Sequence, residues 1–439
     1  MKKSLLFLIG ISTVIAIDAQ NPIIHDQFTA DPSARAFEGR VYLYPSHDIP
    51  APADFARKDW FCMKDYHVFS SDNLTTWKDH GVILSQDKVP WGNPKAYAMW
   101  APDCIYRNGK YYFFYPATPK DFRTGSIGVA IADKPYGPFK PEVTPIKGTR
   151  GIDPCPFIDK DGQAYLYWAG GNIYVAKLKE NMIELASEPQ IIEGLPKGFK
   201  EGPFFFEHNG YYYLTYPLVV DKTETLAYSM GKSPLGPFEY KGLIMDQSPT
   251  GCWTNHHSIV QFKGQWYLFY HHNDYSPQFD KNRSVRIDSL FFNADGTIKK
   301  VSPTFRGVGE TLATDKIQID RYSNLGGGAS IAFLNINNKF DGWKTIFTEQ
   351  GAWLRYNCVN FGNKKLSNLY VRVKSSKGGT LQIRTGKING TLIAQAVIPS
   401  KNIWTVIQSP LTVSPKGVHD IFVEMGNGKQ VEVDWLYFK

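Results

Sequence analysis

A short sequence phrase occurs five times in this chain of 439 residues. Each copy has a glycine, two variable residues, a tyrosine and a bulky apolar residue, and successive copies lie 70, 53, 48 and 54 residues apart. Spacings of this length are typical of one supersecondary unit used repeatedly. Glycine marks a turn and the tyrosine-rich run after it alternates like a strand, so each copy predicts a β-hairpin. The copies begin at Gly39, Gly109, Gly162, Gly210 and Gly264.

Repeated hairpins that close radially form a β-propeller, and five copies predict five blades in an all-β chain. A polar residue opens the first strand of each hairpin, six to nine residues before the glycine. Residues that open the innermost strands converge at one end of the axis. For any single one, capping of a strand end is an equal explanation, but acids at four of five equivalent positions favour a site. These residues are Asp31, Asp103, Asp153, Glu201 and the pair His256-His257.

The repeated phrase does not occur beyond residues 311–320, and the sequence pattern changes there. Short alternating strands return after Gly326-Gly327-Gly328 without the glycine and tyrosine signature. We therefore predict a propeller over residues 20–315 and a separate β-sandwich of the jelly-roll type over residues 320–439.

The first nineteen residues have the features of a secretory signal. Lys2 and Lys3 precede an apolar run from Leu5 to Ile17, and Ala19 offers a small residue for cleavage. The run is too short to span a bilayer. We predict a signal peptide over residues 1–19, a secreted or periplasmic mature protein, and no membrane span.

Charge and cysteine usage exclude some classes of function. The net charge of +8 is spread along the chain and forms no basic block, so nucleic acid is not the expected partner. The five cysteines are scattered, odd in number and without ligand spacing, so we expect buried small hydrophobic residues rather than a disulfide framework or a metal site.

Aromatic residues make up 15% of the chain, and several tryptophans stand in loops between the predicted strands. Strand packing accounts for most of the tyrosines. Loop tryptophans are harder to explain that way, and flat aromatic faces suit the apolar C–H surface of a sugar ring. The candidates are Trp60, Trp91, Trp100 and Trp253, with Trp100 our first choice.

The repeated acids suit glycoside hydrolysis, which needs a proton donor and a second carboxylate across the scissile bond. Glu201 is our donor, because it reaches further than aspartate and the apolar run Gly202–Phe206 after it favours a neutral carboxyl. Asp31 is our general base, since a carboxylate that activates water should stay ionised. Asp153 is expected to orient the donor and adjust its pKa through their mutual charge.

Five separated motifs resemble glycoside hydrolase family 43, over roughly residues 22–312. The resemblance implies a five-bladed propeller, an inverting mechanism and no organic cofactor. It places the base on Asp31, the pKa modulator on Asp153 and the acid on Glu201, and it leaves Asp103 as structural. The motifs are Ala30-Asp31-Pro32-Ser33, Trp100-Ala101-Pro102-Asp103, Asp153-Pro154, Glu201-Gly202-Pro203 and Asn255-His256-His257-Ser258.

The same resemblance implies two further site residues. The family's late-strand arginine falls on Arg286, as a substrate-binding residue. Its histidine falls on His256 and implies a Ca²⁺ ion in the central channel, held largely through water because calcium prefers oxygen ligands. The doublet leaves His257 open as the alternative metal contact.

The implied substrates are arabinofuranosides and xylosides of plant cell-wall polysaccharides. An inverting, exo-acting α-L-arabinofuranosidase is the first choice, and a β-D-xylosidase is the alternative. Specificity should lie in the loops over residues 50–65 and 88–97. The rival from another class is a catalytically inactive, lectin-like sugar-binding protein, and the presence of all three acids argues against it.

The C-terminal part resembles carbohydrate-binding module family 6, on stretches that include Gly351–Tyr356 and Val433-Asp434-Trp435. Such modules hold a sugar between two loop aromatics, which by position are Phe347 and Trp404. Glu432 stands where the family often has a sugar-binding Asn. The alternative is therefore a sandwich that only braces the propeller.

Overall fold

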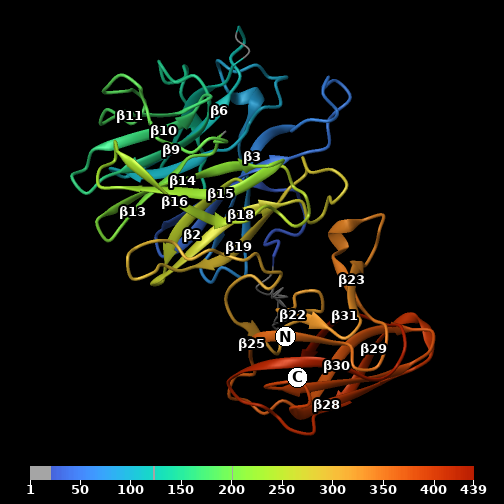
Figure 1. Ribbon diagram of the computed structural model, residues 1–439. Coiled ribbons are helices and arrows are strands. Elements are labelled where there is room, and N and C mark those ends of the chain that lie inside the picture. Colours follow the sequence, from blue (N-terminus) through green and yellow to red (C-terminus); the bar gives the residue numbers. More distant parts are fainter. Residues whose placement is uncertain (1–20, 122–123, 200) are drawn as a thin grey trace, which may run out of the picture.

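The computed structural model describes residues 21–121, 124–199 and 201–439, which form two domains (Figure 1). Apart from the short 3₁₀ turns η1 (Gln86–Lys88) and η2 (Lys339–Asp341), the regular elements of this part are all strands. The predicted signal peptide lies outside the described residues. Among those residues, no helix has the length and apolar character needed to cross a membrane.

The N-terminal domain contains five antiparallel sheets of consecutive strands, four with four strands and one with three. Blade one is β1 (Ala30–Phe37), β2 (Arg40–Asp48), β3 (Met63–Ser71) and β4 (Lys78–Ser85); blade two is β5 (Asp103–Arg107), β6 (Lys110–Ala117), β7 (Ser126–Ala132) and β8 (Lys140–Pro141); blade three is β9 (Ile152–Ile158), β10 (Ala164–Ala169), β11 (Ile173–Lys177) and β12 (Gln190–Ile191); blade four is β13 (Phe204–His208), β14 (Tyr211–Val220), β15 (Thr223–Gly231) and β16 (Phe238–Met245); blade five is β17 (His257–Phe262), β18 (Gln265–His272) and β19 (Ser284–Leu290).

The first strands of the five sheets form a closed ring. β1 contacts β5, β5 contacts β9, β9 contacts β13, β13 contacts β17, and β17 returns to β1. These are the innermost strands of a five-bladed propeller, as the repeated phrase predicts. The polar residues predicted to open the first strands all lie close to the start of an inner strand. They are therefore at one end of the axis.

The glycines of the phrase form the hairpin turns between first and second strands. In blade one, Phe37 pairs with Arg40 across the two-residue turn Glu38-Gly39, in which both residues have positive φ (53° and 74°). This is the twist that matches two strands, and glycine adopts it without steric cost. Blade three differs, because its longer turn is closed by a hydrogen bond from Asp159 N to Gln163 O.

The N-terminal segment completes the fifth blade, a feature that the sequence did not predict. Ile23 N donates to Val285 O at 2.9 Å, and Thr29 N donates to Arg283 O at 3.0 Å. The side chain of Asn21 donates to Ile287 O and accepts from Ile287 N. The two ends of the propeller are thus joined along the outer edge of β19, which would otherwise be an unpaired edge.

The C-terminal domain is a sandwich of two six-stranded sheets. One sheet contains β20 (Thr311–Leu312), β22 (Asn324–Gly326), β25 (Trp353–Asn360), β27 (Gly379–Thr385), β28 (Thr391–Ile398) and β30 (Val418–Gly428); the other contains β21 (Ile317–Gln318), β23 (Ala329–Phe333), β24 (Trp343–Phe347), β26 (Asn368–Ser375), β29 (Lys401–Pro410) and β31 (Val431–Phe438). Its first strand, β20, comes just before the boundary predicted at residues 315–320. Strands such as β26 alternate between buried and half-buried residues, as a two-layer sandwich requires.

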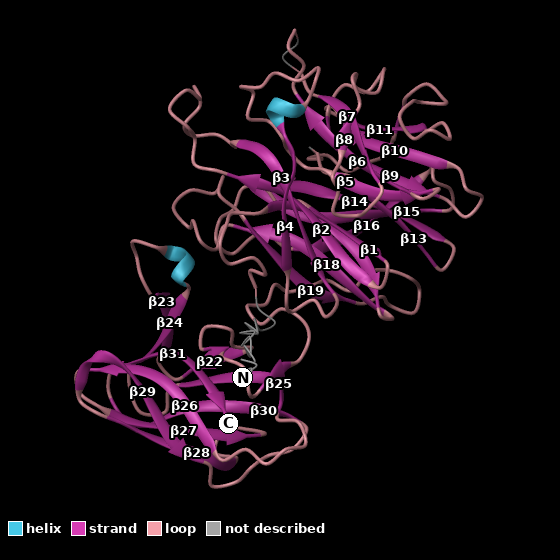
Figure 2. Cartoon of the chain, turned by 180° about the vertical axis from the view of Figure 1, so that it is seen from behind, coloured by secondary structure: helices cyan, strands magenta, loops and turns pink. Residues whose placement is uncertain are grey.

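The hairpin of β23 and β24 reaches toward the propeller, with η2 at its tip (Figure 2). Phe340 of this tip lies 4.9 Å from the Phe28 ring and 5.0 Å from the Tyr275 ring. Tyr275 also stacks on Trp343 at 4.9 Å. This aromatic contact ties the sandwich to the fifth blade.

The cysteines follow the expectation in most respects. All five are free thiols, and four of them are buried. Cys358 differs, because it is exposed at a position with φ of 56° in β25.

Candidate active site

A small cavity at the strand-opening end of the propeller axis collects the three predicted catalytic acids. Its volume is about 140 Å³, and Asp31, Asp153 and Glu201 all line it. The remaining lining residues are Trp60, Phe61, Met63, Trp100, Ala101, Ile152, Trp253, Thr254, His256 and Arg283.

Asp31 is held ionised by a dense set of donors. Arg283 donates to both of its carboxylate oxygens, at 2.8 and 3.2 Å, and Ser46 Oγ donates to Oδ2 at 2.7 Å. Burial works against the charge, but Arg283 and the nearby histidines outweigh it and lower the pKa of Asp31 to about 2. At any ordinary pH Asp31 is a carboxylate.

Arg283 is shared between two buried aspartates. Its Nε and Nη2 donate to Asp48 at 2.9 Å each, while Nη1 reaches Asp31. All three side chains are almost fully buried. A planar guanidinium can hold two carboxylates in fixed directions in this way, so Arg283 orients Asp31 as well as charging it.

Local backbone geometry aims two of the acids. Asp31 and Asp153 have positive φ values of 44° and 57°. Each lies at an irregularity in the pairing of its inner strand, near the start of β1 and β9. Such conformations cost about 1–3 kcal/mol for residues other than glycine and concentrate at functional sites.

Asp153 is in the opposite electrostatic state from Asp31. It is buried, and Gly202 N donates to its Oδ2 at 2.9 Å. Burial and the charges of Glu201 and Asp31 raise its pKa well above the usual value. The cavity therefore shifts the pKa values of two of its carboxyls in opposite directions, that of Asp31 downward and that of Asp153 upward.

A fourth acid, Glu224, stands behind this group and was missed by sequence reasoning. It is fully buried in β15, and Asn255 N donates to its Oε2 at 2.9 Å. Burial and the charge of Glu201 raise its pKa well above the usual value. It lies within a strand rather than at an opening, so the repeated phrase gave no signal for it.

Three of the four candidate tryptophans line the cavity. Trp60, Trp100 and Trp253 are half-buried there, and Trp100 O accepts from Tyr66 Oη at 2.6 Å. Trp91 does not line it and instead stacks on Tyr115 at 6.2 Å. The indole rings give the cavity the apolar walls that a sugar ring would contact.

The adjacent residues His256 and His257 lie in two different environments. His256 lines the cavity, and its Nδ1 lies 3.9 Å from Asp31 Oδ1. His257 is buried beside blade four, where its Nε2 is 2.6 Å from Thr215 Oγ1. Burial lowers the pKa of both rings. Only His256 has access to the cavity, so it is the member able to contact a substrate or an ion there.

The prediction of Arg286 as a substrate-binding residue is wrong. Arg286 is buried inside blade five, where it donates to Asp274 Oδ1 at 2.6 Å and to Thr304 O at 2.8 Å. Arg283 takes the predicted place. The reason is the position of each residue along β19, which begins at the cavity end of the blade. Arg283 precedes the strand and reaches the cavity, whereas Arg286 lies within the strand, away from it.

Asp103 is part of the propeller's internal structure. Its carboxylate accepts hydrogen bonds from Ser33 and from Arg35, whose Nε lies 2.9 Å from Oδ1. The Arg35 guanidinium also donates to Pro156 O and lies 4.8 Å from the Phe204 ring centre. Asp103 is absent from the cavity lining and joins the first, second and third blades instead.

The two aromatic residues predicted for the sandwich differ. Phe347 is fully buried in its core, so it cannot stack on a sugar and that prediction is wrong. Trp404 is half-buried on β29, with the Arg372 guanidinium 4.9 Å from its ring centre. Glu432 is paired with Lys344 at 2.9 Å, which neutralises the charge it brings to this sheet.

Comparison with family models identifies the fold and the chemistry class. A model described as Glycosyl hydrolases family 43 matches residues 19–298, which is more than half of the chain. The chain belongs to glycosyl hydrolase family 43. It is thus a glycosidase by family, and the resemblance inferred from the five motifs is confirmed. A second model, Carbohydrate binding module (family 6), matches residues 327–439.

Relatives in family 43 differ in how much of the chain they match. Xylosidase/arabinosidase 43A of Humicola insolens is 37% identical over 64% of this chain and 99% of its own length. Arabinoxylan arabinofuranohydrolase of Bacillus subtilis (strain 168) is 28% identical over 97% of this chain and 94% of its own.

A solved family 43 structure matches the propeller. It is CoXyl43, a β-xylosidase/α-arabinofuranosidase from a compost microbial metagenome, in complex with xylotriose and in a calcium-free form. It is 36% identical, has a TM-score of 0.60, and covers 65% of this chain and 98% of its own.

Proposed function

We propose that this protein is an inverting, exo-acting glycosidase that releases α-L-arabinofuranosyl residues from plant cell-wall polysaccharides or oligosaccharides. One observation carries the proposal. A small cavity with tryptophan walls contains an aspartate held ionised, Asp31, together with Asp153, whose pKa is raised, and the glutamate Glu201.

In the proposed reaction, Asp31 accepts a proton from a water molecule that attacks the anomeric carbon. Glu201 protonates the departing glycosidic oxygen, and attack from the opposite face inverts the configuration. Arg283 and Ser46 keep Asp31 ionised and oriented. The pKa values of Asp153 and Glu224 are raised by burial and by the charge of Glu201, so the three carboxyls titrate together and the two neighbours adjust the proton affinity of Glu201.

The size of the cavity supports action at a chain end. A space of about 140 Å³ is small and suits one sugar ring better than several. Trp60, Trp100 and Trp253 surround that space and would contact the apolar face of the ring.

The choice of sugar rests on the relatives. One relative that matches almost the whole chain, including the sandwich, is named an arabinoxylan arabinofuranohydrolase, which supports the arabinofuranoside as the first choice. The relative with 37% identity is named for both activities, so a β-D-xylosidase remains the second candidate.

The decisive experiment compares Asp31→Asn and Glu201→Gln with the wild type on an aryl α-L-arabinofuranoside and an aryl β-D-xyloside. General acid and base groups contribute about 10²–10⁴-fold each, so both variants should lose at least a hundredfold in turnover. Proton NMR of the first product should show the inverted anomer. Normal rates in either variant would remove the assigned roles, and initial formation of the retained anomer would remove the single-displacement mechanism. Sugar binding without hydrolysis would favour the lectin-like alternative.

Calcium beside His256 stays a prediction. Calcium takes six to eight oxygen ligands, yet the two aspartates whose charges act on His256, Asp31 and Asp103, are each already paired with an arginine. These residues fit only an ion held mainly by water with a single imidazole contact, and no step of the proposed reaction depends on it. Removing calcium with a chelator and measuring turnover tests the contribution.

Two further parts of the proposal concern location and the sandwich. The basic and apolar N-terminal segment supports export to the periplasm or the exterior, which fractionation of cells tests directly. The family 6 module match and the half-buried Trp404 support sugar binding by the sandwich.

A further inference from the structure

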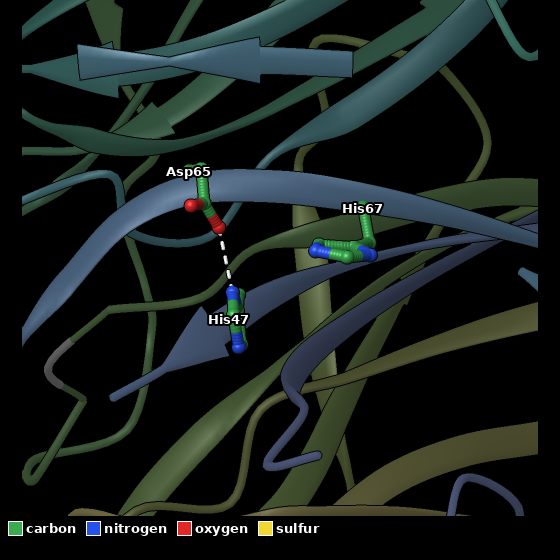
Figure 3. Close-up of side chains that lie close together, drawn as sticks. All are labelled: His47, Asp65 and His67. Atoms are coloured by element: carbon green, nitrogen blue, oxygen red, sulfur yellow. Dashed lines mark hydrogen bonds and ion pairs between the residues drawn. The ribbon is translucent and has the colours of Figure 1, made fainter. Parts of the chain in front are cut away.

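Blade one contains a cluster of two histidines and an aspartate that the proposed reaction does not use. His47 lies near the end of β2, and Asp65 and His67 lie on the neighbouring strand β3. The pairing of β2 with β3 is irregular between Ser46 and Asp48, and there His47 Nδ1 lies 2.6 Å from Asp65 Oδ1 and the His47 ring lies 5.0 Å from the His67 ring. In Figure 3, His47 and Asp65 face each other, and the His67 ring lies beside this pair.

The distances within this cluster suit a metal ion. One ligand atom from each residue can be chosen so that all three lie within 4.8 Å of one another. Among the residues that the structure describes, it is the one group of three His, Cys, Asp or Glu side chains that meets this condition. Zinc bonds of about 2.0–2.2 Å place neighbouring ligands about 3.3–3.5 Å apart, so small side-chain movements would complete the site.

A fourth residue already orients one of the ligands. Asp79 on β4 lies 3.0 Å from His67 Nδ1, and Gly81 N holds the same carboxylate at 2.7 Å. This leaves Nε2 of His67 for a ligand bond. A carboxylate on the second ring nitrogen is the usual partner of a metal-binding histidine, because it fixes the tautomer and makes the ligand more basic.

The surroundings keep the cluster shielded but reachable. The side chains of His47, Asp65 and His67 are 18%, 9% and 15% exposed. Two imidazoles and one carboxylate are ligands that zinc and similar transition metals prefer, whereas calcium and magnesium prefer oxygen alone.

We propose that His47, Asp65 and His67 bind one divalent transition-metal ion of the zinc class, with Asp79 as the orienting partner of His67. Water would fill the remaining coordination positions. This site is separate from the calcium expected beside His256 and from the reacting groups.

The place of the cluster gives the ion a structural role. Successive side chains of a strand point to opposite faces. His47 therefore lies between Ser46, which holds Asp31, and Asp48, which holds Arg283, but on the other side of β2. An ion there would cross-link β2 to β3 directly behind the residues that fix the general base.

The test uses the full chain without a histidine tag, freed of metal and titrated with ZnCl₂ by calorimetry, with metal content measured after dialysis. We expect one zinc ion per chain in the wild type, and at least a tenfold weaker affinity in His47→Gln and in Asp65→Asn. Asp79→Asn should weaken binding about ten- to hundredfold without removing a ligand. His419→Gln is the matched control, since His419 lies in the sandwich and is half-buried like His47 and His67, and His256→Gln tests for zinc at the cavity.

Cobalt(II) gives an independent readout, because its visible absorption reports the nitrogen and oxygen ligands around it. The wild type and His419→Gln should share one spectrum that His47→Gln and Asp65→Asn lose, and zinc should raise the thermal midpoint only where this spectrum is present. Absence of zinc binding below about 100 μM in the wild type would overturn the proposal. So would affinity that persists unchanged in both His47→Gln and Asp65→Asn.

Discussion

The buried residues beside the propeller axis and the buried core of the sandwich differ in their charge. Near the axis, Asp31, Asp48 and Arg283 form a charged network with almost no exposure. The sandwich core is an apolar cluster, and its buried acids Glu424 and Asp434 pair with arginines that reach solvent, whereas Asp320, at the start of this domain, pairs with the buried Arg321. Fully buried charges are costly unless each is paired and hydrogen-bonded, and in the network of Asp31, Asp48 and Arg283 both carboxylates are paired with the guanidinium.

The strands of the two domains reflect the same contrast. β10 and β15 are buried along nearly their whole length, because each blade is covered on both faces by its neighbours. β26 and β31 alternate, because one face of each sandwich sheet packs inward and the other meets solvent. Alternation therefore identifies sandwich core residues readily, whereas in the propeller the positions at strand ends are the informative ones.

The largest expected effect comes from breaking the charged network. Arg283→Met leaves Asp31 and Asp48 buried without their partner. Loss of one member of a buried pair costs about 3–5 kcal/mol, and activity per folded molecule should fall at least a hundredfold. Unfolding in urea and kcat/KM on the aryl substrates measure both.

Arg286→Met is the control for this variant. It unpairs Asp274 at similar burial, so stability should fall by a comparable amount while activity per folded molecule stays within about threefold. Equal losses of activity in the two variants would contradict the assignment of the active-site role to Arg283 instead of Arg286.

Truncation of a side chain in the sandwich core should lower stability nearly as much as Arg283→Met does, but it should leave catalysis unchanged. Phe347→Ala removes a fully buried ring and should cost about 3–5 kcal/mol. Turnover of a small aryl substrate by the propeller should change less than twofold. Val406→Ala, on the exposed side of β29, should change stability by less than about 0.5 kcal/mol. A stable Phe347→Ala variant with weaker sugar binding would restore the ring as a ligand contact.

Asp153 gives a smaller effect that depends on pH. Its raised pKa means that it stabilises the fold while protonated, and this stability is lost as the pH rises through the folded-state pKa. Asp153→Asn removes that loss, so its thermal midpoint relative to the wild type should rise between pH 5 and pH 8. A difference of about 1 kcal/mol corresponds to about 2–4 °C in a domain of this size.

Asp31→Asn provides the opposite case. The pKa of Asp31 is lowered to about 2, so its stabilising contribution is complete at pH 5 and is lost only as the pH falls toward 2. Its difference from the wild type should therefore change less between pH 5 and pH 8 than that of Asp153→Asn, because only the contribution of the Asp31 charge to the pKa of Asp153 is removed. An equally large rise in both variants would contradict the opposite pKa shifts of the two residues.

The smallest expected effect is that of Trp404→Ala. The ring is half-buried on the outer side of its sheet, so stability should change by less than about 0.5 kcal/mol and aryl substrate turnover should be unchanged. Retention on insoluble arabinoxylan should fall if the sandwich binds sugar through this residue. Unchanged retention would favour a bracing role.

The sequence alone determined the repeated unit, the number of blades and the three acids of the cavity. These features are local: a turn glycine, a tyrosine-rich strand and a polar residue at a strand opening recur at regular positions. Asp31, Asp153 and Glu201 follow from that repetition, because equivalent positions in a closed ring must lie near one another.

The tertiary structure alone decided which other residues join them. Arg283 reaches Asp31 because it directly precedes β19 at the cavity end of blade five, whereas Arg286 lies within the strand. Phe347 is buried because it faces the core between the two sheets of the sandwich. Glu224 stands behind Glu201 only after blade four is packed. His47, Asp65 and His67 meet only after β2 pairs with β3. Partners brought together by strand pairing and blade packing leave no mark in local spacing, since the distance between them is set by the fold and not by the chain.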